Sequence, residues 1–126
     1  MVIVRCKGSM ERRVFINTSF EGIHCWLEAP REVLFLQNPH RHNFNVHVEI
    51  TVQHNDRELE FIMLKHQINS YLATNFDAQG VWHMGRMSCE DVAEQLIAFL
   101  KRNYSNRHFS VSVDEDGENG CTLIDL

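Results

Sequence analysis

The sequence has 126 residues, 44% of them hydrophobic, which suits one compact domain and is too short for two, so we expect a single domain over residues 1–126. The formal net charge of −5 argues against general nucleic-acid binding and against binding to anionic membranes. There is no run of about 18 apolar residues. No basic segment precedes an apolar leader, so neither a membrane span nor a signal peptide is expected. Four scattered cysteines without CxxC spacing are typical of free thiols in the cytoplasm: Cys6, Cys25, Cys89 and Cys121.

The first regular pattern follows an N-terminal stretch, residues 1–12, which is expected to be a short strand or an ordered arm. From Arg13, apolar side chains occupy alternate positions, which predicts a half-buried β-strand. Residues i and i+2 share a face of a strand, so His24 is expected on the apolar face with Phe20. Gly22 on that face is a candidate for a bulge or for close approach of a neighbouring segment.

A second strand begins at His40, after a structured loop predicted at residues 28–39. Its apolar residues recur at every second position: Phe44, Val46, Val48, Ile50 and Val52. His40 and His42 share this apolar face at its N-terminal end, so the strand presents two imidazoles side by side, as half of a metal site would require. Arg41 between them is expected to point away, toward solvent or a neighbouring subunit.

The middle of the chain predicts two helices. Apolar residues at helical spacing indicate an amphipathic helix over residues 58–74. A loop over residues 80–85 then carries His83. Ser88 is expected to cap a second helix, with Glu90 in its first turn.

Two further strands close the chain. Alternating residues predict one over residues 109–113, followed by an acidic turn over residues 114–117 and a last strand over residues 121–126. The predicted order is β-β-α-α-β-β. A pair of helices between two hairpins favours an α+β domain, in which an antiparallel sheet carries both helices on one face.

The order of these residues resembles the 6-pyruvoyl tetrahydropterin synthase / 6-carboxytetrahydropterin synthase family over about residues 14–126. Four segments carry the resemblance: Phe20 to His24, His40-Arg41-His42-Asn43-Phe44, Met87-Ser88-Cys89-Glu90 and Val113-Asp114-Glu115. It implies a tunnelling fold (T-fold), in which three subunits close their sheets into a barrel and two trimers usually stack. A homo-oligomer, trimer or hexamer, is therefore expected, and assembly would also cover the edge strands.

The resemblance also implies a site. The family's three zinc-binding histidines correspond to His24, His40 and His42. Three imidazoles with an open fourth position are typical of catalytic zinc. The family's pterin-anchoring glutamate corresponds to Glu115, and Ser88 and Glu90 stand at the start of the helix that contributes to the substrate site.

The proton-transfer residues of the family are not all present. The catalytic cysteine of the family lies four residues before the first histidine of its H-x-H motif, and this position is Leu36. The family's catalytic Asp-His dyad aligns with Asp77-Ala78 once a residue is inserted upstream, which keeps the aspartate and loses the histidine. His83, on the following loop, is the candidate replacement.

Other stand-ins are two glutamates and two cysteines near the site. Glu28 and Glu32 lie in the loop where a branch of the family uses glutamate in place of cysteine. Cys89 begins a helix, where a thiolate is favoured. Cys25 follows His24 but is expected on the opposite face. Each has an ordinary alternative, as a solvated loop charge or a core-facing residue.

Three functions are consistent with these residues. The first is a cytoplasmic, zinc-dependent enzyme that processes a small-molecule pterin, related to lyases acting on dihydroneopterin triphosphate, with altered acid–base residues. The second is a catalytically silent T-fold protein that keeps zinc and a pterin-like ligand for binding or assembly. The third is a small α+β interaction domain without metal, in which the histidines simply end strands and Glu115 is a turn residue.

Overall fold

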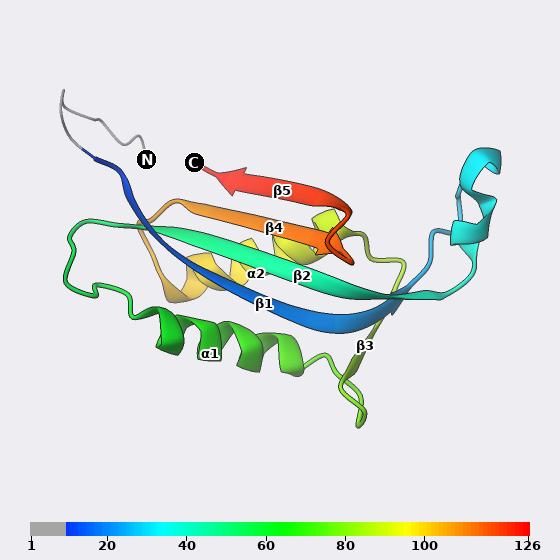
Figure 1. Cartoon of the computed structure of the whole chain (residues 1–126), viewed down its shortest axis with the longest axis horizontal. Coiled ribbons are helices and arrows are strands. Elements are labelled where there is room, and N and C mark those ends of the chain that lie inside the picture. Colours follow the sequence, from blue (N-terminus) through cyan, green and yellow to red (C-terminus); the bar gives the residue numbers. More distant parts are fainter. Residues whose placement is uncertain (1–9) are drawn as a thin grey trace.

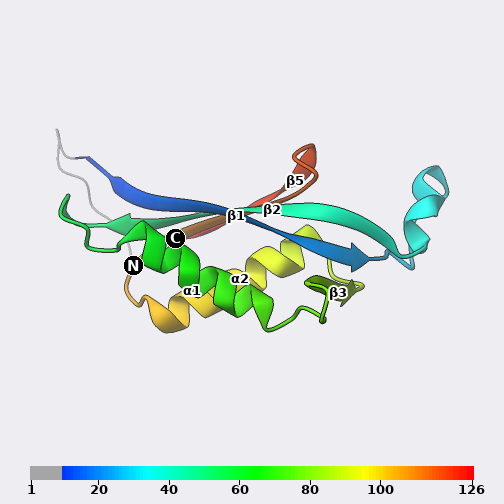
Figure 2. The same cartoon turned by 60° about the horizontal axis from the view of Figure 1, so that its bottom comes forward.

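The computed structural model describes residues 10–126, so the expectation for residues 1–9 lies outside the described part of the chain. The elements of Figure 1 follow in the order β1 (Arg12–His24), η1 (Arg31–Gln37), β2 (His40–Val52), α1 (Phe61–Ala73), β3 (Val81–Gly85), α2 (Cys89–Asn103), β4 (Phe109–Glu115) and β5 (Asn119–Asp125). Figure 2 shows both α-helices beneath one face of the sheet. The predicted α+β class is therefore confirmed.

The sheet has the strand order β3-β1-β2-β4-β5. β1 and β2 pair antiparallel along their whole length, from Arg12↔Val52 to His24↔His40. β2 also pairs antiparallel with β4, and β4 with β5. Alternate residues of β2 face the helices with at most 1% of their surface exposed: Phe44, Val46, Val48 and Ile50. The alternation seen in the sequence is thus the alternation of a buried and an open face.

The two α-helices bury the apolar stripes that their spacing predicted. At most 2% of the surface is exposed for Leu64, Ile68 and Leu72 of α1 and for Val92, Leu96 and Leu100 of α2. Ser88 caps α2 as predicted, because its side chain accepts the Asp91 N–H while the Asp91 side chain accepts the Ser88 N–H. No helix within residues 10–126 is long and apolar enough to cross a membrane.

β3 stands where the sequence predicted a loop. It pairs in parallel with the end of β1, so the five-stranded sheet is mixed rather than wholly antiparallel. Trp82 and Met84 of this strand are buried in the core. Five residues, of which the last is Gly85, show too little alternation to indicate a strand, and the pairing partner β1 decides the structure.

Gly22 accounts for the close packing of β3 and β2 around β1. A Cβ atom on Gly22 would lie 2.4 Å from Met84 Sδ and 2.8 Å from Phe44 Cε2. The close approach that the sequence suggested is therefore present, and the pairing of β1 with β3 shifts register one residue further on, between Ile23 and His24.

Two strand boundaries, the end of β4 and the start of β5, differ from the sequence prediction. β4 continues through Glu115, so the turn is formed by Asp116 and Gly117, at φ 59° and 76°. β5 begins at Asn119, two residues earlier than expected. The backbone pairing of Glu115 with Asn119 extends both strands and places Glu115 on the same face as the buried residues of β4.

Candidate metal centre

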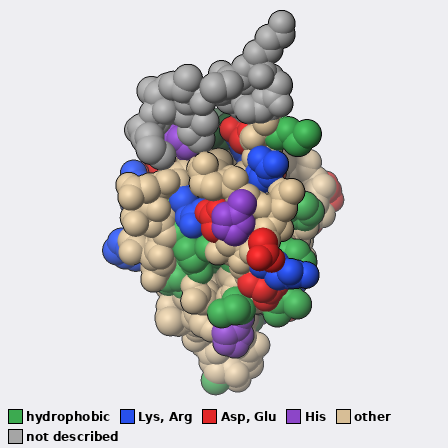
Figure 3. Space-filling model, turned by 90° about the vertical axis from the view of Figure 1, so that its left-hand side faces the viewer, with side chains coloured by type: hydrophobic (Ala, Val, Ile, Leu, Met, Phe, Trp, Pro, Cys, Tyr) green, Lys and Arg blue, Asp and Glu red, His purple; other side chains and the backbone are tan. Residues whose placement is uncertain are grey.

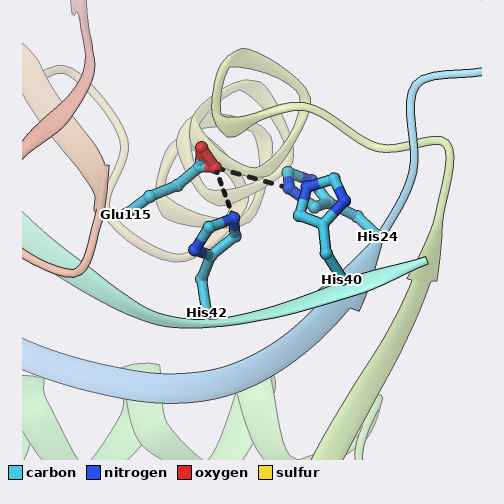
Figure 4. A group of neighbouring side chains, drawn as sticks. All are labelled: His24, His40, His42 and Glu115. Carbon is cyan, nitrogen blue, oxygen red and sulfur yellow. Dashed lines mark ion pairs between the residues drawn. The ribbon is translucent and has the colours of Figure 1, made fainter. Parts of the chain in front are cut away.

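Residues at or near the terminus of three neighbouring strands, β1, β2 and β4, form a cluster at one end of the sheet. His24 ends β1, His40 begins β2 directly opposite it, and His42 lies two residues further along β2. Glu115 ends β4 and pairs with Phe44, the next residue of β2 on the same face. One nitrogen or oxygen of each side chain lies within 4.8 Å of those of the others, and Figure 4 shows these side chains converging.

The second nitrogen of each imidazole is held by an acceptor outside the cluster. His24 Nδ1 lies 2.8 Å from Met87 O, and His40 Nδ1 lies 2.8 Å from Asn38 O. His42 Nδ1 lies 2.7 Å from Asp116 Oδ2. Carbonyl and carboxylate oxygens accept hydrogen bonds, so each Nδ1 carries the proton and donates it. Each Nε2 is then left with the lone pair that a metal ion needs.

Burial makes the inner atoms of the cluster costly without a cation. The side chains of His24 and Glu115 are 12% and 28% exposed. His24 Nε2 and Glu115 Oε2 are themselves buried and have no hydrogen-bond partner. A buried polar atom without a partner costs about 1–3 kcal/mol, and an ion between these atoms would remove that cost. The donor set, the tautomers and the unpartnered atoms all fit a bound metal ion.

A pocket of about 370 Å³ opens beside the cluster. It lies between the ends of the strands and the first turn of α2, and its lining includes His24, His40, Ser88, Glu90 and Glu115. The structure therefore brings the predicted substrate-binding residues together with two of the predicted metal ligands. The volume is in the range of small-molecule sites, roughly 300–1,000 Å³.

Asp77 and His83 form a pair of their own. His83 Nε2 lies 2.7 Å from Asp77 Oδ2, and the other carboxylate oxygen accepts the N–H groups of Gln79 and Val81. The Val81 N–H, followed by His83, lowers the pKa of Asp77. Neither residue lines the pocket. His83 alternates with the buried Trp82 and Met84, so its side chain lies on the face of the sheet opposite the cluster.

The other proposed stand-ins have mixed outcomes. The expectation of a favoured thiolate at Cys89 is wrong, because burial raises the pKa of this thiol to about 12. Cys25 lines the same pocket as His24, since the chain leaves the strand after His24 and strand alternation stops there. Glu28 pairs with Arg86, which also lines the pocket. Glu32 is an exposed residue of η1.

Asp116 is a functional candidate that the sequence analysis treated only as a turn residue. One carboxylate oxygen contacts His42 Nδ1 and the other accepts the Asn43 N–H at 2.8 Å. The Asn43 N–H and then His42 lower the pKa of Asp116. The sequence signal that could have indicated Asp116 is its position between Glu115 and a glycine. Its contacts with His42 and Asn43 result from the pairing of β4 with β2, which the sequence does not reveal.

The other end of the molecule offers a contrast. Histidine, acidic and basic side chains there form ion pairs without a convergent histidine group, such as His54 and Arg107 with Glu58, and Arg57 with Asp56. Figure 3 views the molecule from this end and shows the three kinds of side chain interspersed. Arg41, beside the cluster, points away from the two histidines as predicted and pairs with Glu21 at 3.0 Å.

Comparison with known proteins finds similar structures, all of low sequence identity. No family model and no curated protein matches the sequence. The structure is similar to 6-pyruvoyl tetrahydropterin synthase from Caenorhabditis elegans, with a TM-score of 0.65 and 17% identity over 93% of this chain and 97% of that chain.

Two further structures are alike over a similar length. An uncharacterized protein from Wolinella succinogenes has a TM-score of 0.68 and 12% identity, with 94% of this chain and 100% of that chain covered. A Plasmodium vivax 6-pyruvoyltetrahydropterin synthase, in which a catalytic glutamate is replaced by alanine, has a TM-score of 0.61 and 14% identity, with the same coverage. At these identities the likeness shows the fold, and the fold is the T-fold.

Proposed function

We propose that the chain is a zinc-dependent pterin-processing enzyme, a lyase that acts on dihydroneopterin triphosphate or a related pterin. The observation that carries the proposal is the convergence of three imidazole Nε2 atoms and Glu115 beside a pocket. The fold is shared with 6-pyruvoyl tetrahydropterin synthases. A fold can carry many activities, so the proposal rests on the site and uses the fold as support.

The ligand set His24, His40 and His42 suits zinc. Imidazole nitrogen is a common zinc ligand, and metal-binding histidines almost always donate their other nitrogen to a carbonyl or carboxylate, as all three do here. Zinc bound at this place supplies a Lewis acid that polarises oxygens of the substrate side chain.

The pocket residues provide the means of holding a pterin. The carboxylates of Glu115 and Glu90 can accept hydrogen bonds from the amino group and the ring N–H of the base. Ser88 stands at the N-terminus of α2, where N–H groups and the helix dipole favour negatively charged groups. In this proposal Glu115 and Glu90 hold the ring, while the side chain of the substrate reaches toward His24 and His40.

Proton transfer is where this chain departs from the family pattern. Leu36 lines the pocket, and the thiol of Cys89 stays protonated at neutral pH. The Asp77–His83 pair lies on the opposite face, so in this proposal it serves the site of another subunit. Glu28, which pairs with Arg86 of the pocket lining, is the second candidate acid–base group.

Assembly into a homo-oligomer, trimer or hexamer, is part of the proposal. β3 and β5 are the edges of the sheet in the described chain, and unpaired edges favour pairing with another chain. Apolar side chains that stand exposed around η1 support burial against a further subunit: Trp26, Leu34 and Phe35. The free thiols of the described chain support the cytoplasm as the compartment.

The alternative is a catalytically silent T-fold protein that binds zinc and a pterin-like ligand. The observation that favours it is the pair Leu36 and Cys89, because neither side chain can transfer a proton at neutral pH. It predicts binding without turnover.

Two measurements test the proposal. Metal analysis of protein purified without a histidine tag should give close to one zinc per chain, whereas no zinc and no uptake on dialysis would reject both metal-binding hypotheses. Incubation with dihydroneopterin triphosphate, followed by analysis of the products, then separates the enzyme from the silent protein. If turnover occurs, His83→Ala should lower kcat about 100-fold, the usual scale for a lost general acid or base. An unchanged rate would leave Glu28→Gln as the variant to measure.

A further inference from the structure

The position of Glu115 differs from that of a group whose only task is to hold a substrate ring. Glu115 Oε2 lies 3.4 Å from His24 Nε2 and 3.3 Å from His42 Nε2. Hydrogen bonds between nitrogen and oxygen are usually 2.7–3.2 Å long. In the neutral tautomer that the Nδ1 contacts favour, the Nε2 atoms of His24 and His42 have no hydrogen to donate to the carboxylate.

Lone pairs therefore face lone pairs across this gap. Glu115 Oε2 and His24 Nε2 are buried, and neither has a hydrogen-bond partner. Such an arrangement is repulsive on its own, and it becomes favourable when a cation lies between the atoms.

The distances also match those between ligands of one metal ion. Zinc–nitrogen and zinc–oxygen bonds of about 2.0–2.1 Å separate tetrahedral ligand atoms by roughly 3.3–3.4 Å. The two distances from Glu115 Oε2, 3.4 and 3.3 Å, are of this length. His40 completes the group, since all four ligand atoms lie within 4.8 Å of one another.

The backbone holds Glu115 in this position. It is the last residue of β4, paired with Phe44 of β2, and the next residue, Asp116, contacts both His42 and the Asn43 N–H. One short segment thus sets the carboxylate and the imidazole of His42 relative to each other.

We propose that Glu115 is the fourth metal ligand of the substrate-free protein. This inference rests on the metal site of the proposed function and deepens it. The carboxylate would then occupy the fourth position before substrate arrives, and a substrate oxygen would take that position as the carboxylate moves away. A ligand that carries both ring N–H groups and side-chain oxygens suits this exchange, because the N–H groups give the released carboxylate new partners while the oxygens take its place.

The test uses Co²⁺, whose visible absorption reports the number and kind of its ligands. We expect the Glu115→Gln protein to bind Zn²⁺ more than ~100-fold more weakly than the wild type, beyond the range of about 10–100-fold for changes outside the ligand shell. Its Co²⁺ spectrum should differ from that of the wild type. Glu118→Gln is the matched control, because Glu118 is an acidic residue of the turn that follows Glu115 and lies outside both the ligand group and the pocket lining, and both readouts should stay close to wild type.

The outcomes separate this inference from the proposed function. Equal Zn²⁺ affinity and equal Co²⁺ spectra in the wild type and Glu115→Gln would overturn the inference and leave the three-histidine site standing. Absence of metal uptake by the wild type would overturn both. Addition of dihydroneopterin to the Co²⁺ form should change the wild-type spectrum, and an unchanged spectrum at a saturating concentration would overturn the exchange of ligands. Circular dichroism of each metal-free variant verifies that it is folded.

Discussion

Two groups of histidines and carboxylates in this chain have the same residue types but different geometry. In the metal centre, the Nδ1 atom of each histidine contacts an acceptor outside the group, and Nε2 faces inward. In the Asp77–His83 pair, Nε2 itself lies 2.7 Å from the carboxylate. His24 is 12% exposed and His83 is 64% exposed.

The difference shows that the contact made by the second ring nitrogen decides what a histidine can do. A histidine whose Nδ1 donates to an outside acceptor, a backbone carbonyl or the carboxylate of Asp116, presents the lone pair of Nε2, and several such histidines form a ligand set. His83 instead uses Nε2 itself for its bond to Asp77, which orients it for proton transfer or simply forms an exposed hydrogen bond. Substitutions in the metal centre should therefore weaken metal binding, whereas substitutions in the Asp77–His83 pair should not.

The largest effect is expected from His24→Ala. The side chain of His24 is 12% exposed, compared with 23% for His42 and 28% for Glu115, and its Nε2 faces the centre. Loss of this side chain removes one ligand and opens the pocket to water. We expect the variant to lose stoichiometric zinc, measured by metal analysis after dialysis. His83→Ala is the matched control and should keep its zinc. Equal loss in both variants would contradict the division into two groups.

Asp116→Asn should have an intermediate effect. The carboxylate orients His42 by accepting from Nδ1, and removing such an outer partner typically costs about 10–100-fold in metal affinity. Competition with a chromogenic chelator measures the change. Asp77→Asn, which alters the carboxylate of the other pair, should leave zinc affinity unchanged. An Asp116→Asn affinity equal to wild type would show that the turn alone orients His42.

Much of the fold was open to prediction from the sequence because it depends on local periodicity. Alternation around Phe44 predicted β2, helical spacing predicted α1 and α2, and the Ser88 cap was identified from residue type. β3 could not be predicted, because a five-residue strand at a sheet edge depends on its partner β1. The end of β4 was misplaced for a similar reason: acidic residues favour turns, and the pairing with Asn119 overrides this preference.

The site was predictable to the extent that it follows strand parity. His24, His40 and His42 share the core face, and the structure brings them together. The acceptors of their Nδ1 atoms come from loops and a turn, at Met87, Asn38 and Asp116, and no residue pattern reveals such contacts. The partnership of Asp77 with His83 likewise depends on the turn into β3, which the sequence did not indicate.

Gly22→Ala should have a moderate effect on stability and tests how β3, which carries His83, is held to the sheet. Gly22 pairs with His42 in β2 and with Trp82 in β3, so it lies between the two groups. The new methyl group would meet Met84 Sδ and the buried ring of Phe44, and such overpacking costs about 1–3 kcal/mol. Urea unfolding measures the loss.

A double-mutant cycle with Met84→Ala gives the control for Gly22→Ala. Removal of the Met84 sulfur takes away the nearest atom, so Gly22→Ala should cost less in the Met84→Ala background than in the wild type. Equal costs in the two backgrounds would place the strain at Phe44 alone, and no cost in either would contradict the close packing of β1 and β3.

The smallest effect is expected from the exposed pair, as a change in the pH dependence of stability. Asp77 has a pKa below its usual value of 3.8, chiefly because of the Val81 N–H and then His83. Its contribution to stability is therefore present above that usual value and is lost as pH falls through the lower pKa of the folded state. The difference in unfolding free energy between wild type and Asp77→Asn should shrink over this acid range, in urea titrations of the metal-free protein. His83→Ala should keep most of the pH dependence, because the Val81 N–H is the larger cause; if His83→Ala abolished it, His83 would be the main partner of Asp77.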